Sequence, residues 1–213
     1  MTTKINLKEI ERSAFRATFS DGLTDIFIGI VLLIFAIGPL LQDLGFGDFW
    51  SSIVFLPLFL IAHLIKQKIK RRIVEPRMGT VKFGPKRSRK IKMILAILSA
   101  SLLLGILLGI LFWFHNPHTP SEWLFPGFLS ILLLLIFSGA AFVLDITRFY
   151  LYAFISSLGV ISGELLFQKG HLSHHGYPVF FGVTCLVLIT TGATLFIQFF
   201  EKYPKPNAEV SYE

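Results

Sequence analysis

The sequence has little of what usually drives chemistry or stabilises small soluble proteins. It holds one cysteine, Cys185, which lies in an apolar run and excludes an intrachain disulfide and a CxxC metal site. Charged residues make up only 15% of the chain. The motifs HExxH, GxSxG and Walker A are absent. No motif therefore indicates an enzyme class or a cofactor, and we expect a non-enzymatic protein.

What the chain has instead is apolar surface. Of its 213 residues 54% are hydrophobic, and the mean hydropathy is +0.69, which is outside the range of soluble domains. The net charge of +7 comes mostly from one segment. In a membrane protein such an excess predicts contact with anionic lipid headgroups, and no nucleic-acid partner is expected. The first apolar run lacks the pattern of a cleaved signal peptide, so we expect it to stay as a membrane anchor.

Six apolar stretches are long enough, or nearly so, to cross about 30 Å of hydrocarbon. They are Leu23–Leu41, Phe49–Ile65, Met93–Phe114, Trp123–Leu144, Phe149–Phe167 and Val179–Phe200. The predicted fold class is all-α: a polytopic integral membrane protein with six transmembrane helices paired as three hairpins. Residues 1–20 have the apolar periodicity of a short amphipathic helix in the headgroup plane, the alternative being a loosely ordered cytoplasmic tail.

The distribution of basic residues predicts the orientation. Residues 66–92 hold twelve Lys or Arg and one acidic residue, Glu75. With six spans, every Lys and Arg except Lys169 falls on the same side, as the positive-inside rule requires. We therefore expect an inner (plasma) membrane protein with both termini cytoplasmic. Its parts are a cytoplasmic segment (1–20), a first transmembrane hairpin (21–65), a basic connector (66–92), four further transmembrane helices (93–203) and a cytoplasmic tail (204–213).

Glu164 is the one carboxylate deep in a predicted span. A charged carboxylate in the bilayer is costly, so Glu164 is a candidate for binding a proton or a ligand, with structural and boundary roles as alternatives. Ser156, Ser157 and Ser162 lie on the same predicted helix and are candidates to line a polar path with it. Serine at this density is also ordinary in close helix packing.

Histidines are concentrated in the two later outer turns. They are His115, His118, His171, His174 and His175. Histidine is the commonest metal ligand, so a metal site is a candidate here if the two turns are neighbours. The alternatives are a pH-sensing role and the ordinary polarity of a loop from which topology excludes Lys and Arg.

The basic connector is a candidate docking surface for anionic lipid or for a cytoplasmic partner, or it acts only as a topological anchor. The residues assigned to docking are Arg71, Arg72, Lys86, Arg87, Arg89 and Lys90. A β-hairpin is predicted from residues 72–76 and 80–83. Asp21 and Asp25 are expected to cap the first span and to pair with basic residues such as those of the connector, the alternative being a divalent-cation or phosphate site.

Three functions remain open. The first is a membrane protein that binds or moves a small solute, or that serves as the membrane subunit of a larger assembly. The second is a structural or regulatory protein whose basic loop recruits anionic lipid or a partner. The third is a metal-dependent enzyme at the outer face. A homo-oligomer or a membrane complex partner is compatible with each of them.

Overall fold

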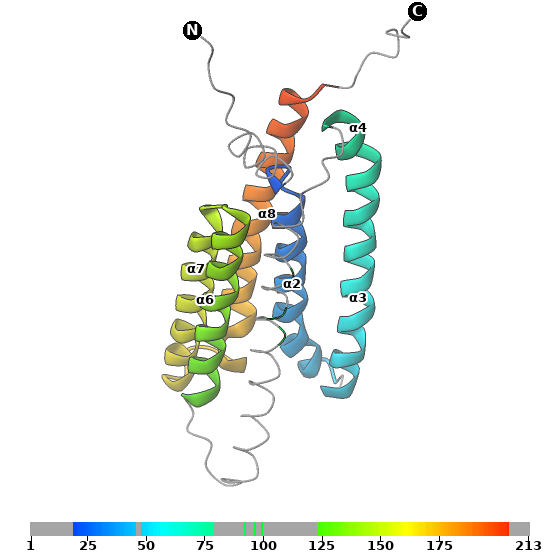
Figure 1. The fold of residues 1–213 in the computed structure, drawn as a ribbon. Coiled ribbons are helices and arrows are strands. Elements are labelled where there is room, and N and C mark those ends of the chain that lie inside the picture. The colour runs from blue at the N-terminus through cyan, green and yellow to red at the C-terminus, as the bar shows by residue number, and fades with distance from the viewer. Residues whose placement is uncertain are drawn as a thin grey trace, which may run out of the picture. The chain divides into compact units, whose positions relative to one another are not determined.

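The computed structural model describes residues 19–45, 48–78 and 123–204, together with Lys92, Ala96 and Ser99 (Figure 1). All regular structure in these ranges is helical, and no strand occurs in them. This confirms the all-helical prediction for the described part of the chain. The amphipathic segment, most of the third predicted span and the outer turn that holds His115 and His118 lie outside the described residues.

Five long helices coincide with five of the six predicted spans. They are α2 (Leu23–Asp43), α3 (Asp48–Ile69), α6 (Leu124–Leu144), α7 (Arg148–Gln168) and α8 (Tyr177–Lys202). Four described segments have the length and hydropathy needed to cross a membrane: Leu23–Leu41, Leu124–Leu144, Arg148–Gln168 and His174–Lys202. Large apolar side chains remain exposed on these helices, including Phe125, Phe142 and Leu186. This composition is compatible with a membrane protein, in which lipid covers such surfaces.

The helix that starts at Asp48 continues well beyond the predicted end of the second span. A π-helical turn, η1 (Lys70–Val74), and a short helix, α4 (Glu75–Met78), extend it into the basic connector. The prediction of a β-strand at residues 72–76 is therefore wrong. These residues belong instead to a helical segment with one packed side: Val74 is buried, whereas Arg71 and Arg72 are exposed.

The chain divides into two compact units, and one of the two boundaries between them in the sequence falls within α8. The first unit contains α2, α3, η1, α4 and the part of α8 from Cys185 onward. The second unit contains α6, α7, the 3-10 turn η2 (His174–Gly176) and the part of α8 up to Thr184. Each unit has a core and a polar cluster of its own.

Aromatic rings hold α2 against α3 in the first unit. Phe27 lies 5.6 Å from Phe59, and Phe35 lies 4.7 Å from Phe55, measured between ring centroids. The His63 ring lies edge-on to Phe27 at 5.9 Å. Because these contacts pair the start of α2 with the end of α3, the two helices are antiparallel.

Glycines bring α2 against α8. A Cβ atom on Gly22 would overlap the carbonyl oxygen of Gly192, and one on Gly192 would lie 2.7 Å from Cγ1 of Ile26. Gly29, about two turns after Gly22 on α2, approaches Ile189 on α8 in the same way. Small residues are needed at such crossings because they let two helix backbones approach closely.

Three chain segments meet at one end of the first unit. Leu23 at the start of α2, Val74 after α3 and Phe199 near the end of α8 form a buried apolar cluster. Arg77 joins the last two segments: its Nη1 donates a hydrogen bond of 3.0 Å to the Tyr203 carbonyl, and its guanidinium lies 4.4 Å from the centre of the Phe200 ring. In Figure 1 these helix ends lie together at the top of the unit.

A buried hydrogen bond joins α6 and α7 in the second unit. The hydroxyls of Ser130 and Ser157 are 2.6 Å apart, and the Ser130 hydroxyl also lies 3.1 Å from the Ser157 carbonyl oxygen. Phe137 packs edge-on against Tyr152 at 6.4 Å. The two pairs show that α6 and α7 form an antiparallel hairpin.

Gly22→Ala tests the α2–α8 crossing. Gly22 has a positive φ of 72° and no room for a side chain, so we expect alanine to lower the free energy of unfolding by about 2 kcal/mol or more. The measurement is the thermal unfolding midpoint of the full chain in detergent. Gly38→Ala is the matched control, because nothing lies within 4 Å of its added Cβ. A loss of stability in the control as large as that of Gly22→Ala would contradict the crossing.

Candidate functional site

Glu164 is the centre of the strongest candidate site. Its residue surface is fully buried near the end of α7, and both carboxylate oxygens have partners. Gln168 Nε2 donates to Oε1 over 3.0 Å, and His175 Nδ1 lies 2.7 Å from Oε2. An ionised carboxylate would accept this hydrogen bond from Nδ1, whereas a protonated carboxyl would donate it to Nδ1.

The loop between α7 and α8 is built so that His175 reaches Glu164. His174 and His175 have φ angles of 51° and 55°, which lie in the left-handed region that non-glycine residues seldom adopt. Gly163 and Gly176 allow the loop to rest directly on α7: a Cβ atom on Gly176 would lie 2.6 Å from the Gly163 Cα. The left-handed backbone of His174 and His175 and the glycines at 163 and 176 thus all favour the contact between His175 and Glu164.

Aromatic rings pack against the imidazole of this carboxylate-imidazole pair. The Phe167 ring lies 4.1 Å from the His175 ring, which stacks on Tyr177 at 5.7 Å, and Tyr177 lies 5.8 Å from Phe181. The Tyr177 hydroxyl is buried and has no hydrogen-bond partner among the described residues. We define the Glu164 site as Glu164, Gln168, His175, Tyr177 and Phe167.

The imidazole of His175 separates the buried carboxylate of Glu164 from the surface. The His175 side chain is 47% exposed, whereas that of Glu164 is 1% exposed. Burying a carboxylate without compensation is unfavourable by several kcal/mol, so Glu164 requires a proton, a cation or strong donors. The site therefore has the chemistry of a receptor for a proton or a small cation, with His175 between the carboxylate and water.

The three serines predicted to accompany Glu164 have different surroundings. Ser156 is buried, and its hydroxyl has no partner among the described residues. It precedes Glu164 by eight residues, which places it about 12 Å deeper along α7. Ser157 bonds Ser130 instead, and the Ser162 hydroxyl donates to the carbonyl of Leu158 on its own helix. Of the three, Ser156 alone fits the predicted polar path.

The metal prediction stays untested as a whole. Within residues 19–45, 48–78 and 123–204 no group of three His, Cys, Asp or Glu side chains is arranged to hold a metal ion. His171 is exposed, His174 is half-buried and His175 faces Glu164. His115 and His118, which the prediction requires from the neighbouring turn, lie outside the described residues.

A second polar cluster lies at the start of α2, in the first unit. Asp21 and Asp25 are fully buried there, and Asp21 Oδ1 accepts a hydrogen bond of 3.1 Å from the Leu23 N–H. The charges of Lys66 and Lys70 act on Asp21. This agrees with the predicted cap and with the predicted pairing to the connector.

Burial dominates the electrostatics of this cluster. It raises the pKa of the Asp21 carboxyl, while Lys70, the Leu23 hydrogen bond and Lys66 oppose the rise and Asp25 adds to it. Burial likewise lowers the pKa of the Lys66 ammonium, with Lys70 acting in the same direction and Asp21 and Asp25 against it. The attraction between the charges is therefore smaller than the cost of removing them from water.

The candidate docking residues are only partly described. Arg71 and Arg72 are exposed on η1. Lys86, Arg87, Arg89 and Lys90 lie outside the described residues. Their assignment to lipid or partner docking stays a prediction.

Sequence reasoning missed three members of the Glu164 site, Gln168, Tyr177 and Phe167, and it named His175 as a candidate metal ligand rather than as a partner of Glu164. Gln168 is four residues after Glu164, a spacing at which helical side chains meet, so its contact was open to prediction. The pairing with His175 was not, because it depends on the left-handed turn and on the contact between Gly163 and Gly176.

Comparison with known proteins gives no family for the chain. No protein-family model matches it, and neither a curated protein nor a solved structure matches it significantly.

Asp21→Asn tests the electrostatics of the second cluster. A raised carboxyl pKa means that folding favours the protonated form, so the contribution of Asp21 is favourable at low pH and is lost as the pH rises through its folded-state pKa. Asparagine stays neutral and keeps an oxygen for the Leu23 N–H. We expect the variant to unfold at a higher temperature than the wild type at neutral pH, by about 2–4 °C for each kcal/mol gained.

This advantage should shrink as the pH approaches about 4. The control is Glu201→Gln, which removes a charge from an exposed position on α8. A lower midpoint for Asp21→Asn at neutral pH would show that the pairing with the lysines outweighs burial.

Proposed function

We propose that the protein is a non-enzymatic, multi-pass membrane protein that binds a small organic ammonium cation at the Glu164 site. The observation that carries this proposal is the fully buried carboxylate of Glu164 in contact with a half-exposed imidazole. In this arrangement His175 occupies the position that a cationic solute would take, and displacing it opens the carboxylate toward water.

The surroundings of the carboxylate favour an organic cation as the ligand. An ammonium group binds a carboxylate by charge-assisted hydrogen bonds and is attracted to the faces of aromatic rings. Phe167 and Tyr177 provide such faces, and the Tyr177 hydroxyl is a further polar group without a described partner. The same binding function would serve a protein that moves the solute across the membrane or one that acts as the membrane subunit of a larger assembly.

The proposed orientation places the Glu164 site on the outer side of an inner (plasma) membrane, with six spans and both termini cytoplasmic. The start of α2 and the end of α8 lie in one cluster, which supports an even number of membrane crossings from one to the other. The long helices described on this path are α2, α3, α6, α7 and α8, which are five. An even number therefore requires one more span between residues 79 and 122. The predicted span Met93–Phe114 supplies it.

Single cysteines test the orientation. Cys185 is the one cysteine of the sequence, so a Cys185→Ser background carries no thiol. In intact cells we expect a membrane-impermeant maleimide to label Ser173→Cys in the α7–α8 turn but not Thr3→Cys or Ser211→Cys. All three should react after the membrane is opened. Labelling of one terminus in intact cells would reject the six-span topology.

Methylammonium tests the binding proposal. We expect it to raise the unfolding temperature of the purified wild-type protein saturably, because a ligand that binds only the folded state stabilises it by about 2.7 kcal/mol at 100 times its Kd. Glu164→Gln keeps the size and hydrogen-bonding capacity of the side chain but removes the charge, so it should abolish the shift.

Ser162→Ala is the matched control on α7, since that hydroxyl bonds only its own helix among the described residues. It should retain the full response to methylammonium. An equal shift in wild type and Glu164→Gln, or no shift in the wild type, would exclude the Glu164 site as the receptor.

A further inference from the structure

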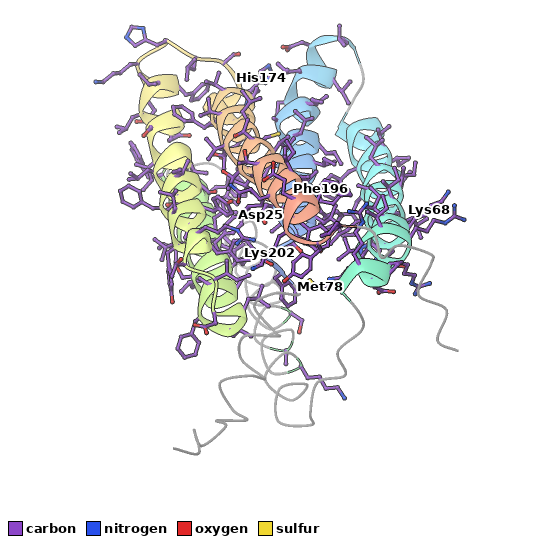
Figure 2. The ribbon with its side chains drawn as sticks, turned by 90° about the horizontal axis from the view of Figure 1, so that it is seen from above. Asp25, Lys68, Met78, His174, Phe196 and Lys202 are labelled. Carbon is purple, nitrogen blue, oxygen red and sulfur yellow. The ribbon has the colours of Figure 1, made fainter. Side chains whose placement is uncertain are left out.

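The cations at the end of α3 divide between two faces of the helix. Lys66 turns inward, with its ammonium 4.7 Å from the centre of the Phe27 ring, and Lys70 lies 5.4 Å from that of Phe19. Lys68, Arg71 and Arg72 are exposed. Figure 2 shows Lys68 projecting from the side of α3 that faces away from α2.

The π-helical turn maintains this division. η1 runs from Lys70 to Val74 and has a wider turn than the α-helix that precedes it. Val74, at 2% exposure, thereby remains on the packed side, against Leu23 and Phe199. Arg71 and Arg72, in the same turn, are exposed.

The outward cations continue a stripe of exposed apolar residues. Leu60, Ile61, Leu64 and Ile65 are 49%, 51%, 61% and 53% exposed on the preceding turns. Lys68 follows Leu64 by four residues and Ile61 by seven, and residues at these spacings share one helical face. A face that changes from apolar to basic along its axis passes from the lipid tails to the level of the headgroup phosphates.

We propose that Lys68, Arg71 and Arg72 form a binding site for the phosphate headgroup of an anionic phospholipid. Within the described part of the chain no ion pair or hydrogen bond engages these three side chains. Arginine guanidinium groups bind phosphate through two parallel hydrogen bonds, and a lysine adds a third positive charge. The adjoining apolar stripe provides the surface for the acyl chains, which a soluble phosphate compound would leave uncovered.

This inference does not depend on the Glu164 site. It also narrows the docking surface predicted for the whole connector. Lys66 and Lys70 are excluded because they face Asp21 and the aromatic rings, and Arg77 is excluded because it binds the Tyr203 carbonyl. Three neighbouring cations on one face, rather than the total charge of the connector, hold the lipid.

The experiment compares two triple variants of the full chain in a neutral detergent. The first is Lys68→Gln, Arg71→Gln, Arg72→Gln, and the second is Lys86→Gln, Arg87→Gln, Arg89→Gln, which removes the same charge from the connector. Phosphatidylglycerol and phosphatidylcholine are titrated, and bound lipid is counted by native mass spectrometry. We expect the wild type to prefer phosphatidylglycerol, and the first variant to lose about 100-fold in affinity for it at low salt.

The second variant should remain within a few-fold of the wild type. An equal loss in both variants would show attraction to the total charge, and no loss in the first would remove the site; either result overturns the proposal. Displacement of phosphatidylglycerol by equimolar glycerol phosphate would overturn the assignment to a lipid. Arg71→Lys, Arg72→Lys keeps the charge and should retain a preference for phosphatidylglycerol, which separates a loss of binding from a loss of folding.

Discussion

Charge compensation inside an apolar helical protein is the constraint on which the polar parts of this structure depend. A carboxylate removed from water needs a proton, a cation or strong donors, because the cost of leaving it unpaired exceeds what most single contacts supply. Glu164 meets this need through Gln168 and His175, and Asp21 lies close to the charges of Lys66 and Lys70. Among the described residues, each of the two units therefore has a cluster with a buried carboxylate, and in both cases the cluster lies near helix ends.

Backbone proximity determines which partners are available. Gly176 lies so close to Gly163 that any side chain at either position would separate α7 from the turn that carries His175. At the other cluster, Gly22 meets Gly192 directly after Asp21, which fixes the start of α2 against α8. Small residues thus act indirectly on the electrostatics, since they decide how close two helices come before the charged side chains meet.

Hydrophobic length predicted the helices well, because a run of about twenty apolar residues has few alternatives to a helix in lipid. The end of α3 was not predicted, since the β-branched Ile73 and Val74 are typical of strands and a π-helical turn leaves no distinct pattern in sequence. Glu164 could be singled out from the sequence because it is a carboxylate within an apolar stretch. Its partner His175 was singled out for metal binding instead, because the turn that brings it onto Glu164 depends on tertiary contacts.

The proposed topology accounts for the different cations of the two clusters. In the proposed orientation Lys169 is the one lysine or arginine on the outer side, so histidine is the more available cationic partner for a carboxylate buried at an outer helix end. On the proposed cytoplasmic side lysines are abundant, and Asp21 and Asp25 lie beside two of them. In the proposed orientation the outer cluster thus places a half-exposed imidazole beside its carboxylate, and the inner cluster lies where the ends of α2, α3 and α8 meet.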